Sequence, residues 1–490
     1  MSEPLLFELG WADGGPPLPP PGVKARALAE IVPPALLRDT PLVIPSLSEP
    51  EVARHFGRLG RLNHNLHQGL YPLGSCTMKY NPTVNEALAR LEPFAGLHPY
   101  HPERMAQGAL RLMWELERAL VAITGMERIS LQPAAGAHGE WTGLRMIQAY
   151  HRTRGERRDQ VLVPDSAHGT NPASAALSGL QTVTVRSGAD GLVDLQDFKS
   201  KLSERVAAVM MTNPNTVGLF EKDIETIARL AHQTGVQLYY DGANLNALVG
   251  LARPREMGFD VVHLNLHKTF STPHGGGGPG AGPVGVKSHL VPFLPLPTVE
   301  RRDDGYVLDY DRPKSIGKVR SFYGNFGMLV RAYAYIRAYG NGINQVALHA
   351  VLNASYLRHH LRRYFDDAFP GPTMHEFVLS AKRARAQGVR ALDIAKRLID
   401  LGFYPPTIYF PLIVPEALMI EPTETESKAT LDLFIQAFDQ IDKEIASEPE
   451  IVKSAPHSAP VGRLDEVRAA RQPDLRWRPA APAPVPAASG

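Results

Sequence analysis

The sequence predicts an α/β protein in which a large domain with a mostly parallel, seven-stranded sheet precedes a smaller C-terminal α+β domain. Between residues 120 and 290, short β-rich runs alternate with helical patterns, which is typical of a parallel sheet covered by helices. After Gly327 this alternation gives way to long helical stretches. A chain of 490 residues that is 44% hydrophobic is long and apolar enough for two or three domains.

The N-terminal residues 1–60 are predicted to form an extended arm. The run Pro16–Pro21 cannot form a helix or a central strand, because proline lacks a backbone N–H and fixes φ. Residues 61–330 follow as the large α/β domain. Its predicted strands are Arg128–Gln132, Gln160–Pro164, Gln181–Val185, Val206–Thr212, Val236–Tyr240, Val261–Asn265 and Gly282–Val286. Its predicted helices begin near Ala137, Asn171, Asp194 and Lys222.

The smaller α+β domain is predicted over residues 331–455. Its expected elements are helices in Met328–Tyr364 with a break near Gly340–Gly342, a strand at Met374–Ser380, a helix at Gly388–Leu401, a strand at Thr407–Tyr409 and a helix at Glu426–Ile445. Residues 456–490 are predicted to be a partly disordered tail, because the segment from Arg478 to Gly490 consists mainly of proline and alanine.

Charge and cysteine content narrow the range of functions. With 52 basic and 50 acidic residues, the net charge of +2 favours neither a nucleic-acid nor a membrane-surface partner. Cys76 is the only cysteine in the sequence, so an intrachain disulfide is excluded. The sequence contains no signal-peptide pattern and no apolar run of membrane-spanning length. We therefore expect a soluble, cytoplasmic protein.

A lysine and an aspartate at two predicted strand ends indicate a site for pyridoxal 5'-phosphate (PLP). Lys268 follows an apolar run and precedes the glycine-rich segment Gly275–Gly280. A lysine after a strand is most often a solvated residue, but this lysine could form a Schiff base with the cofactor aldehyde. Asp241 would pair with the pyridine nitrogen, although an Asp-Gly pair is also a common turn. Ala243 is small enough for a flat ring to lie against it.

Further candidate contacts to the cofactor occur at neighbouring strand ends. They are Gly136, Ala137, His138, His168, Thr212, Asn213, Asn265 and His267. The first three open a helix, whose free N–H groups attract a phosphate. His168 would stack on the cofactor ring, and Thr212 or Asn213 would bind its phenolic oxygen. Each signal is weak alone, but their succession at the ligand-binding edge of one sheet indicates a common site.

The chain resembles fold-type-I PLP-dependent enzymes, whose large domain has an aspartate aminotransferase-like fold. In detail it resembles the glycine-decarboxylating P-protein family of the glycine cleavage system. The matching segments are Gly74–Pro82, Gln132–Glu140, Asp241–Ala247, His263–Phe270 with the glycine-rich segment after it, and Met419–Lys428. The resemblance covers roughly residues 50–450.

This resemblance implies a reaction and several partners. In the family, PLP-dependent decarboxylation of glycine is followed by transfer of the aminomethyl group to the lipoyl arm of the H-protein, with Lys268, His168 and Asp241 at the catalytic positions. Many members are about twice as long, and this chain resembles only their lysine-bearing half. A homologous partner subunit in an α2β2 heterotetramer is therefore implied. Ala134 and Ala135 replace the Asn and Ser of some relatives, which would leave the phosphate to backbone N–H groups.

Other polar residues are candidates for contacts to glycine or to the lipoyl arm. They are His64, Ser75, Cys76, Thr77 and His98. His64 and His98 each begin an H-x-x-H pattern, but no Cys or Glu ligand accompanies either pair, so no metal site is expected. The segment 271–281 would line an entry channel for the lipoyl arm.

The residues leave other functions open. Another fold-type-I activity, that of an ordinary amino-acid decarboxylase or a cysteine-desulfurase-like lyase, would use the same lysine and aspartate. A scaffold subunit without cofactor is a non-enzymatic alternative, and the presence of both Lys268 and Asp241 argues against it. No arginine of the small domain stands out as the ligand of the substrate carboxylate.

Overall fold

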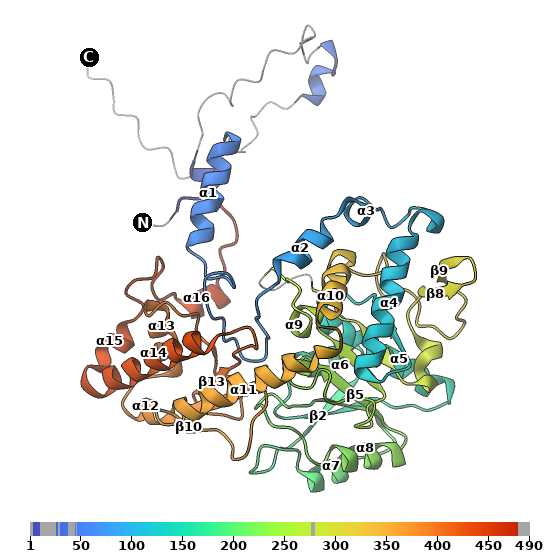
Figure 1. Ribbon diagram of the computed structural model, residues 1–490. Helices are drawn as coiled ribbons and strands as arrows, with labels where there is room; N and C mark the ends of the chain where they lie inside the picture. The colour runs from blue at the N-terminus through green and yellow to red at the C-terminus, as the bar shows by residue number, and fades with distance from the viewer. Residues whose placement is uncertain are drawn as a thin grey trace. The chain divides into compact units, whose positions relative to one another are not determined.

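The computed structural model describes residues 3–9, 26–27, 30–37, 45, 47–275 and 280–478. They divide into two compact units, one made of Met1–Asn65 with Pro456–Gly490 and the other of Leu66–Ala455, and Figure 1 labels their elements. The proline run Pro16–Pro21 and the residues beyond Arg478 lie outside the described residues.

The larger unit contains the predicted seven-stranded sheet. Its strands are β1 (Arg128–Ser130), β2 (Gln160–Pro164), β3 (Gln181–Val185), β4 (Val206–Thr212), β5 (Gln237–Gly242), β6 (Val261–Leu264) and β7 (Val284–Val286), in the order β1-β7-β6-β5-β4-β2-β3. Only β7 runs antiparallel to its neighbours. The sequence prediction of a mostly parallel sheet is confirmed. Strand β5 is longer at its end than predicted, so Asp241 lies within it.

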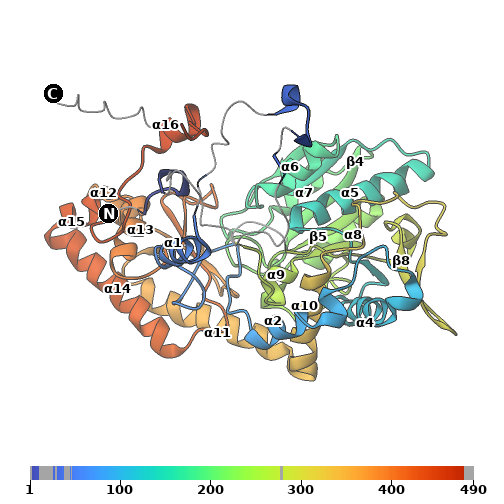
Figure 2. The same ribbon diagram turned by 90° about the horizontal axis from the view of Figure 1, so that it is seen from above.

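Helices cover both faces of this sheet because successive strand residues alternate between two apolar cores. Leu238 and Tyr240 join one core and Tyr239 the other. Helices α4 (Gln107–Thr124) and α10 (Phe326–Tyr339) pack in the first core, and α5 (Gly136–Thr153) and α6 (Thr170–Leu177) in the second. Figure 2 shows the two pairs on opposite sides of the sheet. A sheet buried on both faces explains the nearly continuous apolar runs of its strands.

The larger unit has further helices near this sheet, among them the two that were predicted to begin near Asp194 and Lys222. They are α2 (Thr83–Ala89), α3 (Glu92–Ala95), α7 (Leu195–Lys201), α8 (Ile224–Gln233) and α9 (Leu266–Thr269). The carboxylate of Asp194 caps α7 by accepting from the N–H groups of Gln196 and Asp197, as predicted. A hairpin of β8 (Thr298–Arg302) and β9 (Gly305–Asp309) was not predicted.

A second sheet follows in the same unit. It is antiparallel, with β10 (Asp366–Asp367), β11 (Phe377–Ser380), β13 (Ala417–Ile420) and β12 (Thr407–Ile408) in this order. Its helices are α11 (Asn344–Leu361), α12 (Lys382–Ala386), α13 (Ala391–Asp400), α14 (Lys428–Ser447) and α15 (Pro449–Ser454). The predicted break between α10 and α11 is present as a short 3-10 turn at Gly340–Gly342. One face of this sheet packs against α11, α13 and α14.

The other unit contains helix α1 (Glu49–Arg61), which occupies the end of the segment predicted to be extended. Ser48 and Glu51 form a capping box at its start, and this local signal outweighs the proline content of the preceding residues. Helix α16 (Glu466–Arg471) lies in the predicted tail. None of the helices in the described part of the chain is both long and apolar enough for a membrane span.

Candidate functional site

A cavity with about 840 Å³ of empty volume lies where β4, β5 and β6 end, which is the ligand-binding edge of such sheets. Its lining brings together most of the predicted site residues. From the predicted set it contains Ser75, Cys76, Gly136, Ala137, His168, Thr212, Asp241, Ala243, Asn265, His267 and Lys268. It also contains Ala135, Glu140, Thr170, Thr216, Asn244, His263 and His274.

Lys268 lies in the short helix α9 and is 9% exposed. Its Nζ donates to the backbone carbonyl of Ser75 at 2.6 Å. Ser75 has a positive φ of 61°, and the loop before it passes so close to β13 that a side chain on Gly74 would overlap Met419. The close approach of this loop therefore fixes the carbonyl group that holds the lysine amine.

Asp241 is fully buried at the end of β5. Its Oδ2 accepts from Asn171 Nδ2 at 3.0 Å, its Oδ1 accepts from the Ala243 N–H at 3.0 Å, and His263 Nε2 lies 3.3 Å from Oδ1. Burial by itself raises the pKa of Asp241, but His263 and the two hydrogen bonds outweigh it, so the pKa is lowered. The carboxyl group is thus held as a carboxylate at the cavity wall.

Two residues that the sequence did not assign support this carboxylate. Nε2 of His263 faces Asp241, and Nδ1 of the same ring forms a hydrogen bond with the Tyr239 hydroxyl at 2.8 Å. Glu140 lies beside them, and one carboxylate oxygen each of Glu140 and Asp241 and one ring nitrogen of His263 lie within 4.8 Å of one another, all of them buried. Burial and then Asp241 raise the pKa of Glu140, which favours one negative charge in this cluster, on Asp241.

The predicted anion site lies at the N-terminus of α5. Ala135 is its N-cap and has no side-chain cap bond, so the first N–H groups of the helix are available to an anion. A Cβ on Gly136 would lie 2.6 Å from Asn265 Nδ2. Glycine at this position therefore allows the close contact of this turn with Asn265.

His168 lines the cavity from the turn before α6. Its Nδ1 accepts from the Thr170 N–H at 3.2 Å, and Thr170 Oγ1 donates to Glu140 at 2.8 Å. Burial and then the charge of Lys268 lower the pKa of His168, so its ring is neutral. A neutral imidazole positioned in this way can lie against a flat aromatic ligand.

Several polar atoms of the lining have no partner among the described residues. They include Thr212 Oγ1, Asn265 Oδ1 and His267 Nδ1. Burial, followed by nearby Lys268, lowers the pKa of His267 to about 3, so this ring is also neutral. Buried polar groups are normally hydrogen-bonded. Their arrangement around an amine, an anion site and a carboxylate therefore fits a flat, phosphorylated aldehyde such as PLP.

Four other predicted residues of this unit, His138, Asn213, Thr77 and His98, lie outside the lining of this cavity. The His138 side chain folds back toward the turn before α5, where its Nδ1 accepts from the Ala134 N–H at 3.1 Å. Asn213 accepts from the Glu221 N–H at 2.9 Å, so Thr212 alone of that pair reaches the cavity. Thr77 is buried behind the lining and donates to Glu421. His64 belongs to the smaller unit.

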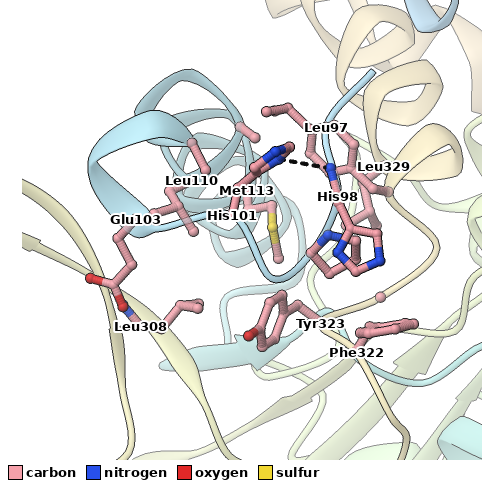
Figure 3. A pocket seen from close by; sticks show the side chains of 15 residues that line it. Leu97, His98, His101, Glu103, Leu110, Met113, Leu308, Phe322, Tyr323 and Leu329 are labelled. Carbon is pink, nitrogen blue, oxygen red and sulfur yellow. Dashed lines mark hydrogen bonds between the residues drawn. The ribbon is translucent and has the colours of Figure 1, made fainter. Parts of the chain in front are cut away.

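His98 lines a different, mostly apolar cavity with about 620 Å³ of empty volume, between α4 and the segment before α10. Figure 3 shows its ring beside Phe322. The His98 N–H donates to His101 Nδ1 at 3.0 Å, and the Tyr100 N–H donates to His98 Nδ1 at 3.1 Å. Both rings thus accept backbone hydrogen bonds through Nδ1.

Solved structures share this architecture. A structure of glycine decarboxylase (P-protein) of the glycine cleavage system superimposes with a TM-score of 0.70 at 23% identity, covering 84% of this chain and 94% of that one. A cysteine desulfurase from Thermococcus onnurineus NA1 superimposes with a TM-score of 0.59 at 15% identity, covering 77% and 95%. The fold is that of fold-type-I PLP-dependent enzymes.

Sequence comparison narrows this class to one family. The family model of the glycine cleavage system P-protein matches residues 24–301, and that of the glycine dehydrogenase C-terminal domain matches residues 346–458. The chain belongs to the glycine cleavage system P-protein family, as its sequence motifs predicted.

Its relatives are similar over their full length. The probable glycine dehydrogenase (decarboxylating) subunit 2 of Exiguobacterium sibiricum is 57% identical, over 97% of this chain and 98% of the relative. The protein of the same name from Caldanaerobacter subterraneus subsp. tengcongensis is 58% identical, over 94% and 95%. An ordinary amino-acid decarboxylase, a desulfurase-like lyase and a cofactor-free scaffold are therefore not favoured.

Proposed function

We propose that this chain decarboxylates glycine with PLP and, together with a homologous partner subunit, passes the aminomethyl group to the lipoyl arm of the H-protein. The observation that carries the proposal is the joint placement of Lys268, Asp241 and the N-terminus of α5 around one cavity, in a chain that is 57% identical to a probable glycine dehydrogenase (decarboxylating) subunit 2. The predicted cytoplasmic location is part of the same proposal.

The residues of the cavity would divide the cofactor contacts among them. Lys268 would bind the aldehyde carbon, the first N–H groups of α5 would bind the phosphate, and Asp241 would hold a proton on the pyridine nitrogen. His168 would lie against one face of the ring and Ala243 against the other. When bound, PLP supplies an electron sink for the electron pair that remains on the glycine carbon after CO2 leaves.

The chain itself would contribute charge, shape and proton transfer. His263 and the hydrogen bonds of Asp241 lower the pKa of this carboxyl group in spite of its burial. Asp241 therefore stays negatively charged and would stabilise the positive charge on the protonated pyridine ring. The neutral rings of His168 and His267 bring no competing positive charge. Lys268, once released from the cofactor, is placed to give or take a proton beside the reacting carbon.

The proposal is tested by adding PLP, the partner subunit and lipoylated H-protein to the purified chain. We expect carboxyl-labelled glycine to release CO2 only with the lipoylated carrier. Lys268→Ala should reduce the rate at least about a thousandfold. Borohydride reduction should fix PLP on the peptide that contains Lys268.

The matched control is Lys314→Ala, which removes an exposed lysine and should keep full activity. Carrier-independent release of CO2 with free methylamine as product would indicate an ordinary decarboxylase instead. A borohydride label on any other lysine would contradict the assigned cofactor site.

A further inference from the structure

A second cluster of titratable groups lies behind the cavity wall, and the proposed function does not use it. His375 and Glu376 precede β11, and Glu421 follows β13. Because Phe377 pairs with Ile420 across the two strands, the two glutamates emerge together at one end of the small sheet. All three side chains are at most 1% exposed, and one ligand atom from each lies within 4.8 Å of the others.

The two glutamates hold the loop that contacts Lys268. Glu376 Oε2 accepts from the Ser75 N–H at 2.8 Å, and Glu421 accepts from the Thr77 hydroxyl. The carbonyl of Ser75 accepts the hydrogen bond from Lys268 Nζ. The carboxyl pair and the lysine therefore bind the same short segment, Ser75–Thr77.

The hydrogen bonding of the cluster is incomplete. Both ring nitrogens of His375 and Oε2 of Glu421 are buried without a hydrogen-bond partner in the described part of the chain. His375 Nε2 lies 3.8 Å from Glu421 Oε1. A buried polar atom without a hydrogen-bond partner lowers the stability of the fold. A proton on the free oxygen of Glu421 would supply a hydrogen-bond donor for the ring of His375.

Charges from several elements act on Glu421. The charged or titratable groups are Lys268 in α9, Cys76 and Lys79 in the loop that contacts Lys268, Glu424 on the same segment, and Glu376 and His375 before β11, and the neutral Thr77 hydroxyl donates a hydrogen bond. Burial is the largest effect and raises the pKa of Glu421 to about 7, while Thr77 and Lys268 act in the opposite direction. Burial and Glu421 also raise the pKa of Glu376. Two buried carboxyl groups this close resist simultaneous ionisation.

We propose that Glu376 and Glu421 hold one proton between them and act as positioning residues that set the charge on Lys268. The inference rests on the proposed role of Lys268 as the cofactor-binding lysine. Loss of the shared proton would place a second carboxylate near the Lys268 amine and stabilise its ammonium form. Gain of the proton would leave the amine freer to become neutral, which it must be to attack an aldehyde.

The test measures the amine of Lys268 directly, without PLP. The full chain is labelled briefly with acetic anhydride at pH 5–10, and acetylation of Lys268 is quantified by mass spectrometry relative to Lys314. In Glu421→Gln the carboxyl group cannot ionise. We therefore expect the acetylation rates of Lys268 in wild type and variant to coincide below about pH 7, and Lys268 of the variant to react about tenfold faster at pH 9.

Two further variants should move the pH at which the profiles separate. Glu376→Gln removes a like charge and should lower this pH, whereas Thr77→Val removes a hydrogen bond to the carboxylate and should raise it. Opposite shifts distinguish a shared proton from general damage to the fold. Glu426→Gln is the matched control, because Glu426 lies in the same segment but is half-buried and outside the cluster.

Coincident profiles of wild type and Glu421→Gln over the whole pH range would overturn the inference, and so would an equal effect of Glu426→Gln. One equivalent of tightly bound metal that disappears in Glu421→Gln would also overturn it, in favour of a metal site. Failure of the proposed function is recognised separately, because then PLP gives no imine absorbance, whereas the acetylation profile does not depend on PLP.

Discussion

At the scale of single residues, the pairing register of the sheet decides which polar groups act together. The sequence placed Asp241 and His263 near the ends of two strands, but it assigned a role only to Asp241. In the structure Asp241 is the register partner of His263 across β5 and β6, so the imidazole reaches the carboxylate. A one-residue change of register would have pointed His263 to the opposite face of the sheet.

Replacement of His263 tests this support. Of the groups that lower the pKa of Asp241 against the effect of burial, His263 has the largest effect, and His263→Leu removes it. We expect the acid limb of the activity profile to move to higher pH and kcat to fall about tenfold, which corresponds to ~1.4 kcal/mol. The measurement is kcat against pH.

His263→Gln is the matched variant, because its amide can still donate to Asp241. It should recover part of the lost rate. Equal acid limbs in wild type and His263→Leu would show that the ring does not influence Asp241.

A second residue-scale prediction concerns the loop that contacts Lys268. In Gly74→Ala the new Cβ would overlap the side chain and carbonyl of Met419, so we expect a loss of about 2–3 kcal/mol in the free energy of unfolding. Urea unfolding measures this loss. Gly342→Ala is the control, since a Cβ at Gly342 has no heavy atom within 4 Å. Equal effects of the two variants would contradict the close contact.

At the scale of elements, buried charges connect segments that are distant in the sequence. Asp260 directly precedes β6. Its Oδ2 accepts from the Leu238 N–H at 2.8 Å and from His232 Nε2 at 2.7 Å, while Oδ1 accepts from Lys287 Nζ at 3.1 Å. One carboxylate thus joins β5, the end of α8 and the residue after β7. Burial raises its pKa, but His232 and Lys287 outweigh burial, so the pKa is lowered from 3.8.

The lowered pKa predicts the pH dependence of this contribution to stability. A carboxyl group whose folded pKa is depressed stabilises the fold above its unfolded pKa, and the contribution is lost as pH falls through the folded value. Asp260→Asn should therefore cost about 3 kcal/mol near pH 7, and the difference from wild type should shrink below about pH 4.

The measurement is the free energy of unfolding by urea between pH 3 and 7. Asp303→Asn, at an exposed position, is the control and should change stability by less than about 0.5 kcal/mol at each pH. A pH-independent cost of Asp260→Asn would contradict the assigned cause.

At the scale of the whole molecule, we expect this chain to work in an assembly with a homologous partner chain. Exposed apolar side chains on the segment from α2 to the start of α4 are available for such a contact. They are Val84 (57%), Leu88 (37%), Leu91 (47%), Tyr100 (72%) and Met105 (59%). Large apolar side chains gathered on one exposed segment are typical of interaction surfaces.

Co-expression with the homologous chain of the same source tests this expectation. We expect a heterotetramer by light scattering, and slower hydrogen exchange in residues 83–105 of the complex than of the chain alone. Leu352, exposed on α11, provides the control, since the exchange of its helix should be unchanged. A monomer with full activity would contradict the expected assembly.

The sequence by itself determined the elements and the chemistry that follow from local pattern. The β-rich runs that alternate with helical patterns predict the seven strands. The motifs around Lys268 and Asp241 predict the family. These features depend on residues that are neighbours in the chain, so their signal is contained in the local sequence.

Only the tertiary structure decided which distant side chains meet. Strand register brought His263 to Asp241, and the antiparallel pairing of β11 with β13 brought Glu376 to Glu421. His98, in contrast, was placed in another cavity. Packing sets such contacts between segments up to hundreds of residues apart, and no local pattern in one sequence specifies them.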